Sequence, residues 1–281
     1  MKTVRIAGVP EHFNHPWQLA IDRGGFKAVD LNLAWTAVPE GTGKMCQMLR
    51  DGTTDFAVIL TEGIIKDIAL GNPCSIVQEY VSSPLLWGIH VAANSPLQSC
   101  GELEGKTVAI SRPGSGSHLM ALVYAKQQNW KAAPVLKVVN TLEGAVTALT
   151  EAQADYFMWE RFMTQPLVDQ GVFKRLGECP TPWPSFVIVG RNAYMEQHPE
   201  VVAQLLKTIN ATTQEFKQLP NIDATLASEF QQKTADIQQW LQLTQWSQQP
   251  LSAESFEAVQ QELLALNLIS KPLTYHQAVK S

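Results

Sequence analysis

The sequence predicts an α/β fold of two lobes with a helical C-terminal tail. Short apolar runs alternate with helical patterns up to about residue 190, which is typical of α/β layers around a largely parallel sheet. The segments "GTGKMCQMLRDGTTDFAVILTEG" and "TLEGAVTALTEAQADYFMWER" resemble each other, and aligning Leu49 with Leu149 also aligns Asp55 with Asp155. This internal similarity predicts two lobes built on one plan, and the continuous helical pattern from Pro199 onward predicts the tail.

The first lobe is predicted element by element from its apolar pattern. We expect a strand over Val4–Val9 and a helix that begins near Pro16 and ends at Gly24–Gly25. A strand with alternating apolar residues follows over 29–35, and then a helix over Gly43–Asp51. The continuous apolar run "DFAVIL" predicts a buried strand over 55–60.

The stretch "VAISRPGSGSHLMALVYA", residues 108–125, predicts a strand, a polar loop and a helix. No lysine follows Gly116, so the loop is not a phosphate-binding P-loop, and its glycine spacing fits neither a nucleophile elbow nor a dinucleotide fingerprint. A ligand-facing helix start with free backbone N–H groups remains, and a serine that only caps the helix is the alternative. We expect bulky residues at Ser115 and Ser117 to abolish ligand binding and leave the fold intact.

Composition excludes several partners. The chain of 281 residues is 45% hydrophobic and carries a net charge of −5, which argues against nucleic acid and against a membrane surface. It has no apolar run long enough for membrane insertion and begins directly with a strand, so we expect a cytoplasmic protein as written, or a periplasmic one if a signal was removed. Four scattered cysteines predict buried thiols, and we expect neither a metal nor a cofactor.

The run "SPLQSCGELEGKTVAISRPGSGSHLMALVYAKQQNW" resembles the signature of substrate-binding proteins of nitrate, sulfonate and taurine ABC transporters, in the thiamine-pyrimidine-synthase-like superfamily. "GTGKMCQMLRDGTTDFAV" and "ADYFMWERF" fit the same pattern, and the resemblance extends to about residue 215. It implies a type II periplasmic-binding-protein fold with lobe I at 1–83 and 190–281 and lobe II at 84–189. The hinge crossings would then lie near Val81–Leu86 and Ser185–Val189.

The resemblance also implies a function. We expect a monomeric solute-binding protein that closes by hinge motion on one small molecule, with an ABC-transporter permease as its partner. A small anion and a nitrogen heterocycle both remain open as ligands. The alternatives are a cytosolic enzyme on the same scaffold, with Glu11, His12 or His118 as acid or base, and a ligand-sensing protein.

The candidate ligand residues lie in loops at the predicted strand ends. In the first lobe they are Glu11, His12, Phe13, Asn14, Trp17, Gly41, Thr42, Gly43, Thr61, Glu62 and Ser83. In the second lobe they are Arg112, Ser115, Gly116, Ser117, His118, Trp159, Glu160 and Trp183. None of them is assigned a catalytic role.

Each group of candidates has a chemical reason and a plainer alternative. The two helix starts could hold an anion, Arg112 could pair with an acid, Glu62 and Glu160 could accept from an amine or a heterocycle, and the tryptophans could stack on a planar ligand. The alternatives are Asn14 as a helix cap, Trp17 as a core residue, structural ion pairs for the glutamates and ordinary packing for the tryptophans.

Overall fold

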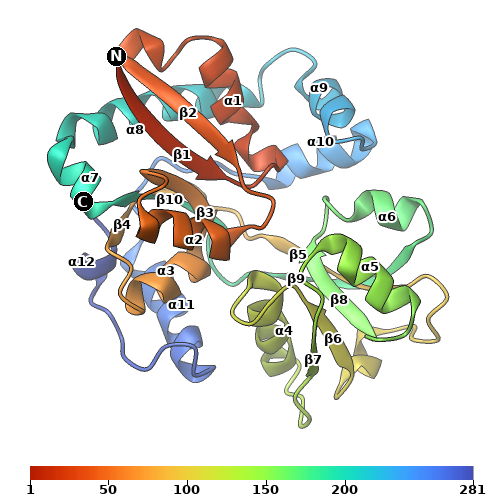
Figure 1. Ribbon diagram of the computed structural model, residues 1–281. Helices are drawn as coiled ribbons and strands as arrows, with labels where there is room; N and C mark the ends of the chain where they lie inside the picture. The colour runs from red at the N-terminus through yellow and green to blue at the C-terminus, as the bar shows by residue number, and fades with distance from the viewer. Residues whose placement is uncertain (281) are drawn as a thin grey trace. The chain divides into compact units, whose positions relative to one another are not determined.

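The computed structural model describes residues 1–280, and the chain forms two compact units (Figure 1). Unit 1 comprises Met1–Ser83 and the described residues from Trp183 onward, and unit 2 comprises Pro84–Pro182. The chain therefore returns to unit 1 at Pro182–Trp183 and not at residue 190. The expected crossing over Ser185–Val189 instead falls largely in a strand, Phe186–Arg191, that pairs with two strands of unit 1.

Unit 1 contains a five-stranded sheet of order β2-β1-β3-β10-β4. Its strands are β1 Lys2–Gly8, β2 Leu31–Ala37, β3 Phe56–Leu60, β4 Cys74–Val81 and β10 Phe186–Arg191. Its helices are α1 His15–Asp22, α2 Thr42–Asp51, α3 Thr61–Ala69, α7 Asn192–Gln197, α8 Pro199–Phe216, α9 Ile222–Glu229, α10 Thr234–Leu243, α11 Ala253–Ala265 and α12 Tyr275–Ala278, with short 3₁₀ turns at His12–Asn14 and Lys27–Val29. The predicted helical tail is confirmed, with single β-bridges at Trp246 and Val279.

The strand order of unit 1 defines where a ligand would bind. β1, β2 and β3 are parallel, and β1 lies between the other two. Because crossovers between parallel strands are right-handed, α1 and α2 cover opposite faces of the sheet. The connection after β1 leads to β2 on one side of the sheet, and the connection after β3 leads to β4 on the other side. The switch point therefore lies between β1 and β3. In open α/β sheets ligands bind at the carboxyl ends of the strands at such a switch point.

Unit 2 repeats this plan in a second five-stranded sheet of order β7-β6-β8-β5-β9. Its strands are β5 Leu86–Ala92, β6 Thr107–Ile110, β7 Val135–Val138, β8 Tyr156–Glu160 and β9 Phe173–Pro180. Its helices are α4 Gly116–Gln127, α5 Leu142–Thr150 and α6 Gln165–Asp169, with a 3₁₀ turn at Cys100–Leu103. The parallel trio β7-β6-β8 places the switch point of unit 2 between β6 and β8.

The internal similarity seen in the sequence corresponds to one repeated contact. Asp55, just before β3, accepts a hydrogen bond of 3.0 Å from the backbone N–H of Arg5 in β1. Asp155, just before β8, accepts one of 2.8 Å from the backbone N–H of Thr107 in β6. Each aspartate ties the start of its own strand to the parallel neighbour. The predicted α/β fold class is confirmed, and its two sheets have the same strand order around each switch point.

Candidate functional site

The switch point of unit 1 is formed by the residues that follow β1 and β3. The register pairs Ile6 with Phe56 and Ala7 with Ala57, so the loop after β1 and the start of α3 lie at one edge of the sheet. Glu11 lies in that loop, and Thr61 and Glu62 open α3 directly after β3. The sequence predicted all three as ligand residues, and the strand order brings them to one edge.

Glu62 and Thr61 are buried but incompletely hydrogen-bonded. The exposed fractions of Thr61 and Glu62 are 0% and 1%. The indole Nε1 of Trp183 donates to Glu62 Oε2 at 2.9 Å. Within residues 1–280, Glu62 Oε1 and Thr61 Oγ1 have no hydrogen-bond partner. Buried polar atoms are nearly always paired, so these two oxygens are exceptions.

Burial raises the pKa of Glu62 from its ordinary 4.5 to about 7. A hydrogen bond from its own backbone N–H, the hydrogen bond from Trp183 and the charge of Lys66 all lower this pKa, but burial outweighs them. A carboxyl group near neutrality can be ionised by a ligand that donates a hydrogen bond or carries a positive charge. Glu62 is therefore a buried carboxyl group bonded to Trp183 and not part of a surface ion pair.

The start of α2 touches the start of α3. Gly41 precedes α2 with a φ of 75°, a left-handed value that favours glycine. A Cβ atom placed on Gly63 would lie 2.3 Å from Thr42 Cγ2, so Thr42 packs directly on the first turn of α3. Gly43 is exposed at the same helix start. The predicted residues Gly41, Thr42 and Gly43 therefore adjoin Thr61 and Glu62.

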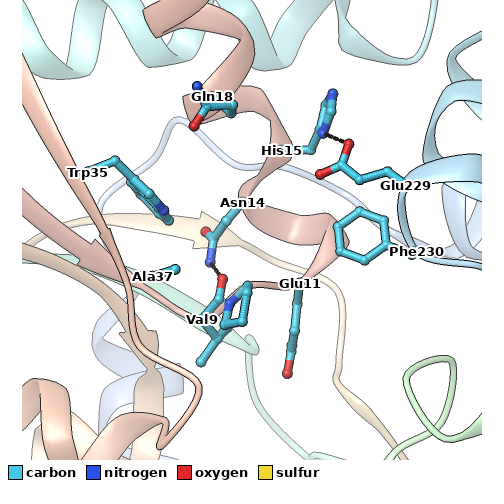
Figure 2. A pocket seen from close by; sticks show the side chains of 10 residues that line it. Val9, Glu11, Asn14, His15, Gln18, Trp35, Ala37, Glu229 and Phe230 are labelled. Carbon is cyan, nitrogen blue, oxygen red and sulfur yellow. Dashed lines mark hydrogen bonds and ion pairs between the residues drawn. The ribbon is translucent and has the colours of Figure 1, made fainter.

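Figure 2 shows a pocket of about 210 Å³ beside the β1–α1 loop. Its lining residues come from the loop and 3₁₀ turn after β1, from α1, from β2 and from the end of α9: Val9, Pro10, Glu11, Asn14, His15, Gln18, Trp35, Ala37, Glu229 and Phe230. The Glu11 side chain extends away from the pair formed by His15 Nδ1 and Glu229 Oε2, which are 2.9 Å apart. Burial raises the pKa of Glu11 to about 7.

Asn14 is one of the residues that line this pocket. Its exposed fraction is 5%, and its Nδ2 donates to the Val9 carbonyl at 2.9 Å. It does not cap α1 with its side chain, contrary to the plainer alternative considered from the sequence. Asn14 Oδ1 lacks a partner in the described part of the chain. Among the described residues, Asn14 Oδ1 is thus a buried acceptor without a partner, on a residue that lines the pocket of Figure 2.

Three predicted ligand residues lie in the core instead. His12 and Trp17 are 0% exposed and Phe13 is 4% exposed. Trp17 stacks on Phe26, with ring centroids 5.9 Å apart, so the alternative of a core residue holds for it. The His12 ring lies 4.2 Å from the ring of Phe230, and burial lowers its pKa to about 3. A neutral, inaccessible imidazole cannot act as the acid or base of the enzyme alternative.

We expect His12→Phe to protect the protein against acid. A histidine whose pKa is about 3 when folded and 6.5 when unfolded destabilises the fold as the pH falls below 6.5. At pH 5 this amounts to about 2 kcal/mol, which phenylalanine would remove. Denaturant unfolding at pH 8 and at pH 5 measures this free-energy cost. The variant should lose less stability than the wild type when the pH is lowered from 8 to 5. Equal losses would contradict the burial of a neutral His12.

In unit 2, the loop after β6 is internally hydrogen-bonded. Ser115 caps α4 by accepting from the backbone N–H of His118 at 3.3 Å, and Ser117 Oγ accepts from the N–H of Ser111 at 3.0 Å. The N–H of Gly114 donates to His118 Nδ1 at 2.9 Å. Gly116 opens α4, and Arg112 is half-buried. Because Ser115 and Ser117 hold the loop together, bulky residues there would damage the fold, contrary to our expectation from the sequence.

The loop after β8 completes this switch point. Glu160 is buried, and its Oε2 accepts from the N–H of Met163 at 2.6 Å. Trp159 is half-buried and stacks on Phe157, with ring centroids 5.4 Å apart. These contacts of Glu160 and Trp159 both lie within unit 2. Ser83, the last candidate, accepts from the N–H of Gln245 at 3.0 Å.

Sequence reasoning missed eight lining residues of the pocket in Figure 2: Val9, Pro10, His15, Gln18, Trp35, Ala37, Glu229 and Phe230. Trp35 lies at an alternate apolar position of β2, where a core role was the ordinary expectation. Glu229 and Phe230 come from the tail, and no local pattern links them to the β1–α1 loop. Among the described residues, no group of three His, Cys, Asp or Glu residues could hold a metal ion. No described helix combines the length and apolar character of a membrane span.

Comparison with known proteins assigns the fold. The family model described as Ca3427-like PBP, a periplasmic-binding-protein family, matches residues 87–179, which lie in unit 2. The structure of the Candida albicans CA3427 gene product, described as a generic periplasmic-binding-protein fold, superposes with a TM-score of 0.92 at 24% identity and covers 100% of this chain and 96% of its own. No curated protein matches.

Two further structures agree. The alkanesulfonate-binding protein SsuA from Xanthomonas axonopodis pv. citri, bound to MOPS, gives a TM-score of 0.82 at 20% identity and covers 100% of this chain and 98% of its own. A ligand-binding component of an ABC-type import system from Staphylococcus aureus gives 0.77 at 14% identity, with 100% and 97% covered. The chain has the periplasmic-binding-protein fold, as its sequence predicted.

Proposed function

We propose that the protein is a solute-binding protein that takes a small molecule at its switch-point loops. The observation that carries this proposal is the position of Thr61 and Glu62, buried with unpaired oxygens where β3 ends beside β1. The loop after β6 occupies the same topological position in unit 2. Polar groups at switch points are the usual ligand contacts of open α/β sheets.

The comparisons support the same class of function. One similar structure is described as an alkanesulfonate-binding protein and another as a component of an ABC-type import system. We accordingly propose an ABC-transporter permease as the partner. Of the three acid or base candidates in the enzyme alternative, His12 lies in the core, and Glu11 and His118 remain.

A thermal-shift screen with recovery of the ligand tests the proposal. A ligand at 100 times its dissociation constant should add about 2.7 kcal/mol to the stability of the folded protein. A bound compound that is recovered chemically unchanged would support a binding protein. A compound that is consumed would instead establish an enzyme, and a hit unaffected by changes at Thr61 and Glu62 would place the site elsewhere.

A further inference from the structure

We infer that the ligand carries a hydrogen-bond donor, either a protonated amine or an N–H-bearing nitrogen heterocycle, and is not a simple anion. This inference rests on the proposed function and names its ligand class. It follows from the unpartnered oxygens of Asn14, Thr61 and Glu62, which follow β1 and β3, and from the charges around them.

Among the described buried atoms of unit 1 without a hydrogen-bond partner, three are oxygens of predicted ligand residues, namely Glu62, Thr61 and Asn14. Glu62 Oε1 is a carboxyl oxygen whose partner oxygen already accepts from Trp183 Nε1 at 2.9 Å. Asn14 Nδ2 donates to a carbonyl, which can only accept, so the orientation of the amide is fixed and Oδ1 is the open atom. Thr61 Oγ1 can accept or donate. Asn14 Oδ1 therefore requires a donor from the ligand, and Glu62 Oε1 requires one whenever the carboxyl group is ionised.

The charges in unit 1 favour the same class. Glu11 and Glu229 line the pocket of Figure 2, and its cationic candidate, His15, is already paired with Glu229. Lys44 near the start of α2 is exposed and donates to Gln47. Lys66 lies on α3 beyond Glu62, and its effect on Glu62 is smaller than that of burial. The pocket of Figure 2 thus contains two carboxyl groups and, as its one cationic candidate, a histidine that is already paired with one of them.

Helix N-termini are the main argument for an anion, and α3 weakens it. Glu62 occupies the first turn of α3, where a bound anion would lie, so an anion there would face a carboxyl group. The first turn of α2 contains no acidic residue. Its N–H groups can bind a carbonyl or hydroxyl oxygen of the same ligand, which a heterocycle or an amino compound can supply.

The test compares two sets of small probes on the full chain. Donor probes are 4-aminopyrimidine, benzylamine and ethanolamine, and anion probes are benzoate, methanesulfonate and nitrate. Calorimetry measures each dissociation constant for the wild type, for Glu62→Gln and for the control Glu254→Gln. Glu254 also lies in the first turn of a unit 1 helix but is exposed. We expect donor probes to bind the wild type and the control equally, and Glu62→Gln roughly 10- to 100-fold more weakly.

The outcomes separate this inference from the proposed function. Binding of an anion probe without any donor probe would leave the function standing and overturn the ligand class. Donor binding that Glu62→Gln leaves unchanged would also overturn the ligand class. Failure of every probe to bind the folded wild type would count against both.

Discussion

Glu62→Gln is expected to stabilise the ligand-free protein at neutral and alkaline pH while it weakens ligand binding. The pKa of Glu62 is raised from 4.5 to about 7 in the folded state, so the folded protein keeps a proton that the unfolded chain releases between these values. Stability therefore falls as the pH rises from 4.5 to 7. Above pH 7 the full cost of the buried carboxylate is present, about 3 kcal/mol.

Denaturant unfolding at pH 4 and pH 8 measures this effect. The stability gained by Glu62→Gln should be larger at pH 8 than at pH 4 by about 1 to 3 kcal/mol, because glutamine keeps the acceptor for Trp183 and has no charge to bury. Glu11 titrates in the same range, so the comparison must be between variant and wild type at each pH. A gain that does not change with pH would show that Glu62 is not a desolvated carboxyl group.

Higher stability together with weaker ligand binding in Glu62→Gln would distinguish a binding residue from a structural one. A buried carboxyl group that only held the fold together would destabilise it when replaced. At Glu62, one oxygen is satisfied by Trp183 and the other is open, so the folded protein bears the cost of burial without full compensation. A ligand that donates to the open oxygen would supply that compensation.

Much of this site could be predicted from the sequence because strands β1, β3, β6 and β8 carry clear apolar runs. Once the strands are located, the residues after them, including Glu11 and Glu62, must lie at the carboxyl edge of a sheet. Their side-chain environment could not be predicted in the same way. His12 is buried by Phe230, and the two residues are distant in the sequence. Only tertiary packing decides that His12 lies in the core while Glu11 lines a pocket.

The return crossing shows a second limit. The run "FVIVGR" is apolar enough to be a strand, but its pairing with β3 and β4 is non-local. Local pattern alone does not say to which sheet such a strand belongs. The resemblance to a family gave the plan of two lobes, and the pairing of β10 decides that the chain has already returned to unit 1 before this strand begins.

The repeated aspartates provide a test of the common plan, with a large effect expected at one of them. Asp55 is 1% exposed and accepts both from the Arg5 backbone N–H and from Arg5 Nε, each at 3.0 Å, while Arg191 lies 3.8 Å away. Asp55→Ala leaves these donors without their acceptor, and we expect it to cost about 3 kcal/mol of unfolding free energy.

Asp155 occupies the equivalent position with fewer partners. It is half-buried and accepts from the Thr107 backbone N–H at 2.8 Å, so Asp155→Ala should cost about 1 kcal/mol. Hydrogen exchange localises both effects: the Arg5 amide should lose protection in one variant and the Thr107 amide in the other. Equal costs for the two variants would show that the ion pairs at Asp55 add nothing to the backbone contact. Exchange unchanged at both amides would refute the shared contact itself, and with it the physical basis of the internal similarity.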